Sequence, residues 1–188
     1  MSEDSRLKII SVTGAHSGVG KTTLCAFLLN EFEGFGAIKF TKTPLFSSLV
    51  DDEAELKHKG KDTAIMYAAG AEKVLWIKSP PDGLGDVLKM ALERMRSLKG
   101  VVVEGNSPVD FLNPHLVIFI VGEDGEIKPS ALNVAVRADV LVYNSDKGAG
   151  NLNLPFATKK AVKVFSINLT EKSGESDDFI AYLKERIA

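Results

Sequence analysis

Apolar residues are spaced along the chain in two ways that alternate with each other. Short runs such as 101–103 and 116–121 are continuously apolar, which is typical of buried parallel strands. Longer stretches have a helical period, and the clearest apolar stripe consists of Leu84, Val87, Leu88, Ala91, Leu92, Met95 and Leu98. The alternation predicts an α/β fold, namely a three-layer α/β/α sandwich around a mainly parallel sheet of about seven strands.

The boundaries of the expected elements follow from these runs and from the glycines between them. We expect strands over residues 7–13, 36–40, 73–77, 101–104, 116–121, 140–143 and 162–167. We expect helices over residues 21–33, 62–69, 84–98, 130–138 and 177–187. Residues 42–60 are polar and have no long period, so we expect a loop there with at most one helical turn. A loop of this length in a compact domain is often functional.

Length, charge and cysteine content narrow the class of protein. The 188 residues fit a single domain, 1–188. Lys and Arg number 23 against 25 Asp and Glu, so the total indicates no basic face and we expect no nucleic-acid partner. Cys25 is alone, and the charged N-terminal residues differ from a signal peptide. The longest apolar run, 116–121, is far shorter than the roughly 20 residues that cross a bilayer. We therefore expect a cytoplasmic protein without a membrane partner.

The segment 13–23 reads TGAHSGVGKTT and lies between the first expected strand and the first expected helix. This order of strand, glycine-rich turn and helix is the context of a phosphate-binding loop. Successive backbone N–H groups from Ser17 to Thr22 would surround the β-phosphate. Lys21 would reach the β- and γ-phosphates, and the Thr22 hydroxyl would bind Mg²⁺. The predicted nucleotide-binding residues are Gly14, His16, Ser17, Gly18, Val19, Gly20, Lys21, Thr22 and Thr23.

Other candidates lie where the neighbouring strands end. Glu104 ends an apolar strand and could supply the carboxylate that Mg²⁺ requires beside Thr22. Lys39 also ends an expected strand, although its position alone favours a solvent-facing lysine over a site residue. Asp62 either acts in the site or only caps the helix that follows it. Likewise, His16 either contacts phosphate or bonds the backbone of its own loop.

Three further residues carry weaker signals. His58 and His115 lack the spacing of zinc ligands, so we expect no zinc site. Cys25 falls on the helix after the loop, where a packed thiol is more common than a nucleophile.

The spacing of the loop resembles one branch of the P-loop NTPases. Gly14 is followed by five residues and then Gly-Lys-Thr, as in dethiobiotin synthetase, cobyrinic acid a,c-diamide synthase, the MinD/ParA ATPases and MobB. Within that branch the chain most resembles MobB, the molybdopterin-guanine dinucleotide biosynthesis adaptor protein. The matching segments are Ala37-Ile38-Lys39 with Thr41, Gly60-Lys61-Asp62-Thr63 with Ala69-Gly70-Ala71, and Val103-Glu104-Gly105. They lie in the expected order within the first 110 residues.

The resemblance implies a P-loop NTPase fold and a function. A MobB-like protein would bind GTP, or ATP, with Mg²⁺ and hydrolyse it slowly. The resemblance implies that Lys21, Lys39, Asp62 and Glu104 act in catalysis and that Thr22 and Glu104 bind the metal. It also implies a homodimer that works beside a molybdopterin-handling enzyme in molybdenum cofactor biosynthesis.

The chain departs from the MobB pattern in three places. Phe40-Thr41-Lys42-Thr43 stands where the family usually has histidines, and Asn106-Ser107-Pro108 follows Glu-Gly. The guanine-recognition motif Asn-Lys-x-Asp is missing, because Asn144-Ser145-Asp146-Lys147 has these residue types in another order. A preference for guanine over adenine is therefore an inference from the resemblance alone.

Two alternatives remain open. An ATP-dependent carboxylate-activating ligase similar to dethiobiotin synthetase would share Gly14, Lys21, Thr22, Lys39 and Glu104, although the proline usual after that lysine and the Ala-Gly-Gly usual after Glu-Gly are absent. A nucleotide switch resembling MinD/ParA would need a second lysine at the position of His16, and a histidine is mostly neutral at pH 7.

Overall fold

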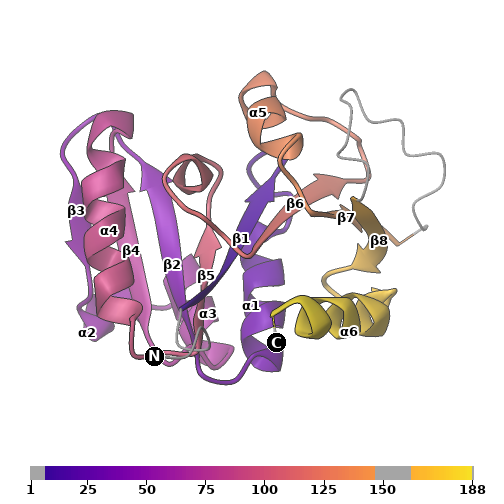
Figure 1. Ribbon diagram of the computed structural model, residues 1–188, viewed down its shortest axis with the longest axis horizontal. Coiled ribbons are helices and arrows are strands. Elements are labelled where there is room, and N and C mark those ends of the chain that lie inside the picture. Colours follow the sequence, from indigo (N-terminus) through magenta and orange to yellow (C-terminus); the bar gives the residue numbers. More distant parts are fainter. Residues whose placement is uncertain (1–6, 147–161, 188) are drawn as a thin grey trace.

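The computed structural model describes residues 7–146 and 162–187. Its core is a nine-stranded sheet in the order β3-β4-β2-β5-β1-β6-β7-β8-β9 (Figure 1). The strands are β1 (Lys8–Gly14), β2 (Phe35–Lys42), β3 (Ser48–Val50), β4 (Val74–Ser79), β5 (Gly100–Glu104), β6 (Leu116–Gly122), β7 (Val140–Asn144), β8 (Lys163–Asn168) and β9 (Ser173–Gly174). Residues 1–6, which entered the argument against a signal peptide, lie outside the described residues. So does Lys147, the last residue of the segment compared with the guanine-recognition motif.

Seven of these strands pair in parallel, from β4 at one side to β8 at the other. They correspond to the seven strands expected from the sequence, so the predicted fold class is confirmed. The two additional strands are short antiparallel edges, β3 on β4 and β9 on β8. With three and two residues respectively, they are too short to give a periodic pattern.

Helices cover both faces of the sheet (Figure 1). They are α1 (Lys21–Glu31), α2 (Glu53–Leu56), α3 (Asp62–Ala68), α4 (Leu84–Met95), α5 (Leu132–Ala135) and α6 (Ser176–Ile187). The four-residue α2 is the helical turn expected within 42–60. Helix α5 is much shorter than the helix expected over 130–138. A 3-10 turn precedes it, and i→i−3 hydrogen bonds at Arg137 and Ala138 tighten the chain before it enters β7.

The register of the sheet decides which residues share a face. Val74, Ala37, Val102 and Ile10 are aligned on neighbouring strands and belong to the core cluster that includes α1 and α3 residues. The residues next to them along the strands point the other way and pack with α4. Side chains two positions further along, towards the carboxyl ends of the strands, therefore lie on the α1 and α3 side.

Among the described residues, no helix combines the length and the apolar character that crossing a membrane would require.

Candidate functional site: a phosphate loop and two strand ends

The loop between β1 and α1 has a fixed backbone. Gly20 precedes α1 with a φ of 107°, a left-handed conformation that favours glycine. A Cβ atom at Gly20 would lie 2.9 Å from Nδ2 of Asn144 and 3.1 Å from Cδ1 of Leu169. Both the turn and the close approach of the chain therefore require glycine here.

Two asparagines hold the ends of this loop. The side-chain amide of Asn106 accepts a hydrogen bond from the Gly14 N–H and donates one to the Gly14 carbonyl, both at 3.0 Å. Asn144 donates to the Val19 carbonyl at 3.2 Å and accepts from the Leu169 N–H at 3.1 Å. The loop is thus fastened to the segment that follows β5, to the last residue of β7 and to the residue after β8. Sequence analysis assigned neither residue this task, although both stand directly at or after a strand end.

Strand register places the charged candidates side by side. Lys39 of β2 aligns with Glu104 of β5, and Glu104 aligns with Val12 of β1. On its other side Lys39 aligns with Trp76 of β4. The Lys39 ammonium forms an ion pair with Oε1 of Glu104, whose side chain is only 3% exposed. Neighbouring parallel strands thus bring together a lysine and a carboxylate that are 65 positions apart in the sequence.

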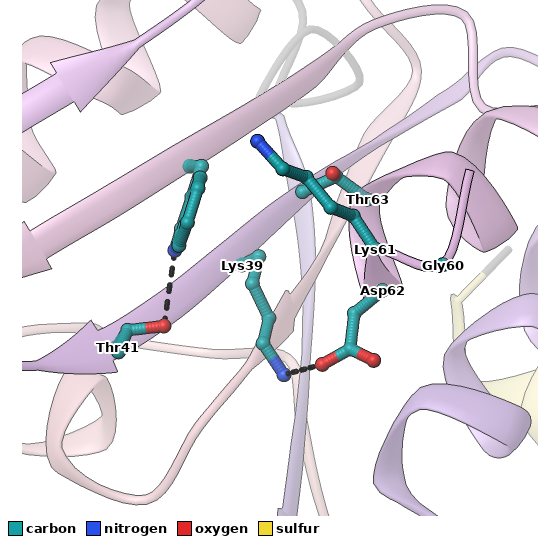
Figure 2. A pocket seen from close by; sticks show the side chains of 7 residues that line it. Lys39, Thr41, Gly60, Lys61, Asp62 and Thr63 are labelled. Atoms are coloured by element: carbon teal, nitrogen blue, oxygen red, sulfur yellow. Dashed lines mark hydrogen bonds and ion pairs between the residues drawn. The ribbon is translucent and has the colours of Figure 1, made fainter. Parts of the chain in front are cut away.

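Two helix starts complete the cluster. Asp62, the first residue of α3, places Oδ2 2.7 Å from the Lys39 ammonium, as Figure 2 shows. Thr22, near the start of α1, donates a hydrogen bond from its hydroxyl to Oε2 of Glu104 at 3.0 Å. Lys39 therefore lies between two carboxylates, and Glu104 lies between a lysine and a hydroxyl.

The two lysines differ in their electrostatic surroundings. Burial lowers the pKa of Lys21, and this outweighs the opposing effect of Glu104. The Lys21 ammonium donates a hydrogen bond to the His16 carbonyl at 2.7 Å. Burial would also lower the pKa of Lys39, but Glu104 and Asp62 together raise it above the ordinary value. Lys21 is thus the cation that gains most from a nearby anion.

These groups surround a cavity of about 310 Å³, which we call the phosphate cavity. Its lining consists of Ser17, Gly18, Gly20, Lys21, Thr22, Thr23, Lys39, Asp62 and Glu104. The structure therefore brings together all four residues predicted for catalysis and both predicted for the metal.

Three of the predicted nucleotide-binding residues lie outside that lining. Gly14 ends β1, and Val19 is buried in the core. The His16 ring lies near Asp124 (Nε2 to Oδ2, 3.4 Å) and bonds the Ser17 carbonyl through Nδ1 at 2.7 Å. His16 instead lines a neighbouring cavity with residues 126–129.

The donor set fits a magnesium ion. Thr22 and Glu104 offer a hydroxyl and a carboxylate oxygen within 3.0 Å of each other. In the part of the chain that the structure describes, no group of three or more His, Cys, Asp and Glu side chains could hold a metal by itself. Mg²⁺ usually binds one or two protein oxygens and takes its other ligands from phosphates and water, so a two-ligand site is suitable.

Cys25 has no part in this arrangement. It is fully buried, and burial raises the pKa of its thiol well above the ordinary value. A buried thiol that resists ionisation is a packing residue.

Comparison with known proteins identifies solved structures that share this fold. No protein-family model and no curated protein matches the chain. Among solved structures, the hydrogenase maturation factor HypB from Archaeoglobus fulgidus is 17% identical with a TM-score of 0.63, and the match covers 97% of this chain and 91% of HypB. LpxK from Aquifex aeolicus, in complex with ATP, is 20% identical with a TM-score of 0.52.

The LpxK match covers 85% of this chain and 53% of LpxK, so the chain spans about half the length of that protein. A plasmid partition protein from Borrelia burgdorferi is 13% identical with a TM-score of 0.50, and the match covers 96% of this chain and 100% of that protein. Identities this low show the fold alone. The chain has the P-loop NTPase fold, a mostly parallel sheet covered by helices, as its sequence predicted.

Proposed function

We propose that the protein binds a nucleoside triphosphate together with Mg²⁺ in the phosphate cavity and hydrolyses it slowly. The observation that carries the proposal is the contact between the Thr22 hydroxyl and the Glu104 carboxylate inside a cavity that also holds two lysines. This combination offers two oxygen ligands to a cation and two ammonium groups to phosphates.

Each lining group has a distinct task in this proposal. The backbone N–H groups from Ser17 to Thr22 bind the β-phosphate, and the Lys21 ammonium reaches the β- and γ-phosphates. Thr22 and Glu104 hold the magnesium ion, which neutralises charge on the phosphate oxygens when bound. Lys39 is aligned with Glu104 on the adjacent strand β2, which continues to Lys42 and so does not end at Lys39 as expected, and it lines the same cavity.

Hydrolysis should be slow because the cavity has few groups that could activate or orient an attacking water. Asp62 is the second carboxylate in the lining, but the Lys39 ammonium lies 2.7 Å from it. The Lys39 ammonium therefore already occupies this carboxylate, which is not free to orient an attacking water. Among the described residues that line the cavity, none is an arginine or a glutamine, the residues that commonly stabilise the transition state or orient water in P-loop enzymes.

For the biological role we propose a MobB-like function with GTP, as a homodimer beside a molybdopterin-handling enzyme. The motifs around Lys39, Asp62 and Glu104 support this proposal through their resemblance to MobB. Guanine preference has the same support and no separate recognition motif.

A carboxylate-activating ligase is the second candidate, and one observation favours it. A second cavity borders the phosphate cavity along Lys39 and Asp62, which leaves room for another substrate near the γ-phosphate position. The switch-like alternative has no comparable support: the His16 ring lies 3.4 Å from Asp124, in the segment after β6, and bonds the Ser17 carbonyl of its own loop.

Calorimetric titration with non-hydrolysable GTP and ATP analogues, with and without Mg²⁺, tests the proposal. We expect Mg²⁺-dependent binding that favours the GTP analogue. In Glu104→Gln the enhancement by Mg²⁺ should fall by about tenfold or more, because the metal loses a charged ligand. Glu93→Gln, on the exposed side of α4, is the control and should behave like the wild type.

Preference for the ATP analogue would favour the ligase instead of the MobB-like role. Absence of binding by either analogue would contradict the proposal as a whole.

A further inference from the structure

The second cavity, of about 250 Å³, has walls that are fixed before any ligand arrives. It is lined by Lys39, Thr41, Gly60, Lys61, Asp62, Thr63 and Trp76, and we call it the Trp76 cavity. The Trp76 indole N–H donates to the Thr41 hydroxyl at 3.0 Å. The Thr63 hydroxyl donates to the buried Leu56 carbonyl at 2.7 Å, which fastens the start of α3 to the end of α2.

The cavity exists because α3 covers only part of the sheet face. Ala37 and Val74 lie beneath the helix, in the core cluster that contains Met66 of α3. The next pair on the same face, Lys39 and Trp76, lines the cavity together with residues 61–63 at the start of the helix. The sheet there presents an aromatic ring and an ammonium to the cavity instead of packed apolar side chains.

Positive charge gathers around the ring. The ammonium groups of Lys78 and Lys61 lie 3.8 Å and 5.1 Å from the centre of the Trp76 ring. Within residues 7–146 and 162–187, the salt bridges of both lysines end on one carboxylate, that of Glu55, at 4.0 Å and 3.3 Å. Two cations thus share one anion. In Figure 2 the Lys39 ammonium points to the Asp62 carboxylate, whereas the Lys61 side chain extends away from that carboxylate.

We propose that the Trp76 cavity binds a small molecule with a carboxylate or phosphate group. The oxyanion lies on Lys61, whose partner carboxylate, Glu55, is shared with Lys78, and the body of the molecule packs against the Trp76 ring. Asp62 lines the same cavity, but its carboxylate is held by the Lys39 ammonium. The proposal deepens the proposed function, because Lys39 and Asp62 line both cavities and the ligand would lie beside the bound triphosphate.

The chain contains a single tryptophan, so emission excited at wavelengths where the three tyrosines do not absorb comes from Trp76. The probes are benzoate, phenyl phosphate and the uncharged benzamide. Titrations use the full chain carrying Lys21→Ala, which removes the main phosphate ligand of the loop and keeps oxyanions away from it. We expect benzoate or phenyl phosphate, but not benzamide, to change the Trp76 emission in a saturable way, and the better of the two identifies the oxyanion.

Adding Lys61→Ala should weaken that binding by about tenfold or more, because a charged donor is lost. Lys59→Ala removes an exposed lysine of the same loop and should leave it within about twofold, since surface charges contribute little. Calorimetry with benzoate or phenyl phosphate on the same variants checks the result independently of the fluorophore.

The inference is wrong if neither anion binds, if benzamide binds equally well, or if Lys61→Ala has no effect. Nucleotide binding is measured separately on chains that retain Lys21. A protein that binds Mg²⁺ and nucleotide but no aromatic anion would retain the proposed function and lose this inference. A protein that binds the aromatic anion but neither Mg²⁺ nor nucleotide would retain anion binding in the Trp76 cavity and lose the proposed function.

Discussion

At the scale of single residues, the site depends on one ion pair in the sheet. Lys39 and Glu104 occupy aligned positions on β2 and β5, and both side chains are largely withdrawn from water. Burying two charges is costly, and removal of one partner leaves the other uncompensated. The pair therefore constrains both stability and binding.

Replacing Lys39 with methionine should lower the free energy of unfolding by about 3 kcal/mol, near the lower end of the range for a broken buried pair, because Thr22 still bonds Glu104. Chemical denaturation measures the change. Lys42→Met, on the exposed end of the same strand, is the control and should change stability by less than about 0.5 kcal/mol.

The same variant gives a pH dependence with a definite sign. Because the folded pKa of Lys39 is raised above 10.5, its charge contributes stability that is fully present below pH 10.5. That contribution is lost as the pH rises through the folded pKa. The difference in unfolding free energy between wild type and Lys39→Met should therefore shrink above pH 10.5, and a difference that stays constant or grows would contradict the assignment.

At the scale of elements, the loop depends on segments that follow other strands. Asn106 bonds both polar groups of Gly14, and Asn144 connects the loop to the residue after β8. These contacts set the position of the loop backbone independently of the residues that would touch phosphate.

Asn106→Ala should destabilise the fold by about 2 kcal/mol, because two hydrogen bonds to the Gly14 peptide are lost. It should also weaken nucleotide binding, since the loop loses its anchor. Thermal denaturation and nucleotide titration measure the two effects. Asn30→Ala, the control, removes one exposed hydrogen bond within α1 and should change neither stability nor affinity. Normal nucleotide affinity in Asn106→Ala would show that this anchor is dispensable for binding.

The sequence predicted the parts of the fold that have a period or a special turn. The seven parallel strands, the loop before α1 and the stripe of α4 all belong to this class. The edge strands β3 and β9 and the shortened α5 were not predicted, because they depend on pairing and tight turns specific to this chain.

The candidate site was likewise predicted only in part. Lys39, Asp62 and Glu104 were found as strand-end and helix-start residues, whereas the contacts of Asn106, Asn144 and Trp76 depend on strand order and register. Register follows from three-dimensional pairing, which a single sequence does not display.

At the scale of the whole molecule, the parallel sheet gathers the carboxyl ends of β1, β2 and β5 beneath the loop, where ligands of open α/β sheets bind. The second half of the sheet supports this edge, since the Ala15 N–H donates to the Ile120 carbonyl of β6 at 2.9 Å. The proposed binding residues thus all lie within the first 104 positions, and the strands beyond them support the site.

The most direct measurement of the central claim is a calorimetric titration of wild type and Lys21→Ala with Mg²⁺ and a non-hydrolysable triphosphate. We expect Lys21→Ala to lose affinity by about a hundredfold or more, since the half-buried cation proposed to bind the phosphates is removed. Its thermal unfolding should be nearly unchanged, and Lys89→Ala on the exposed face of α4 should bind like wild type. Equal affinity in wild type and Lys21→Ala would contradict the claim that the loop binds the phosphates.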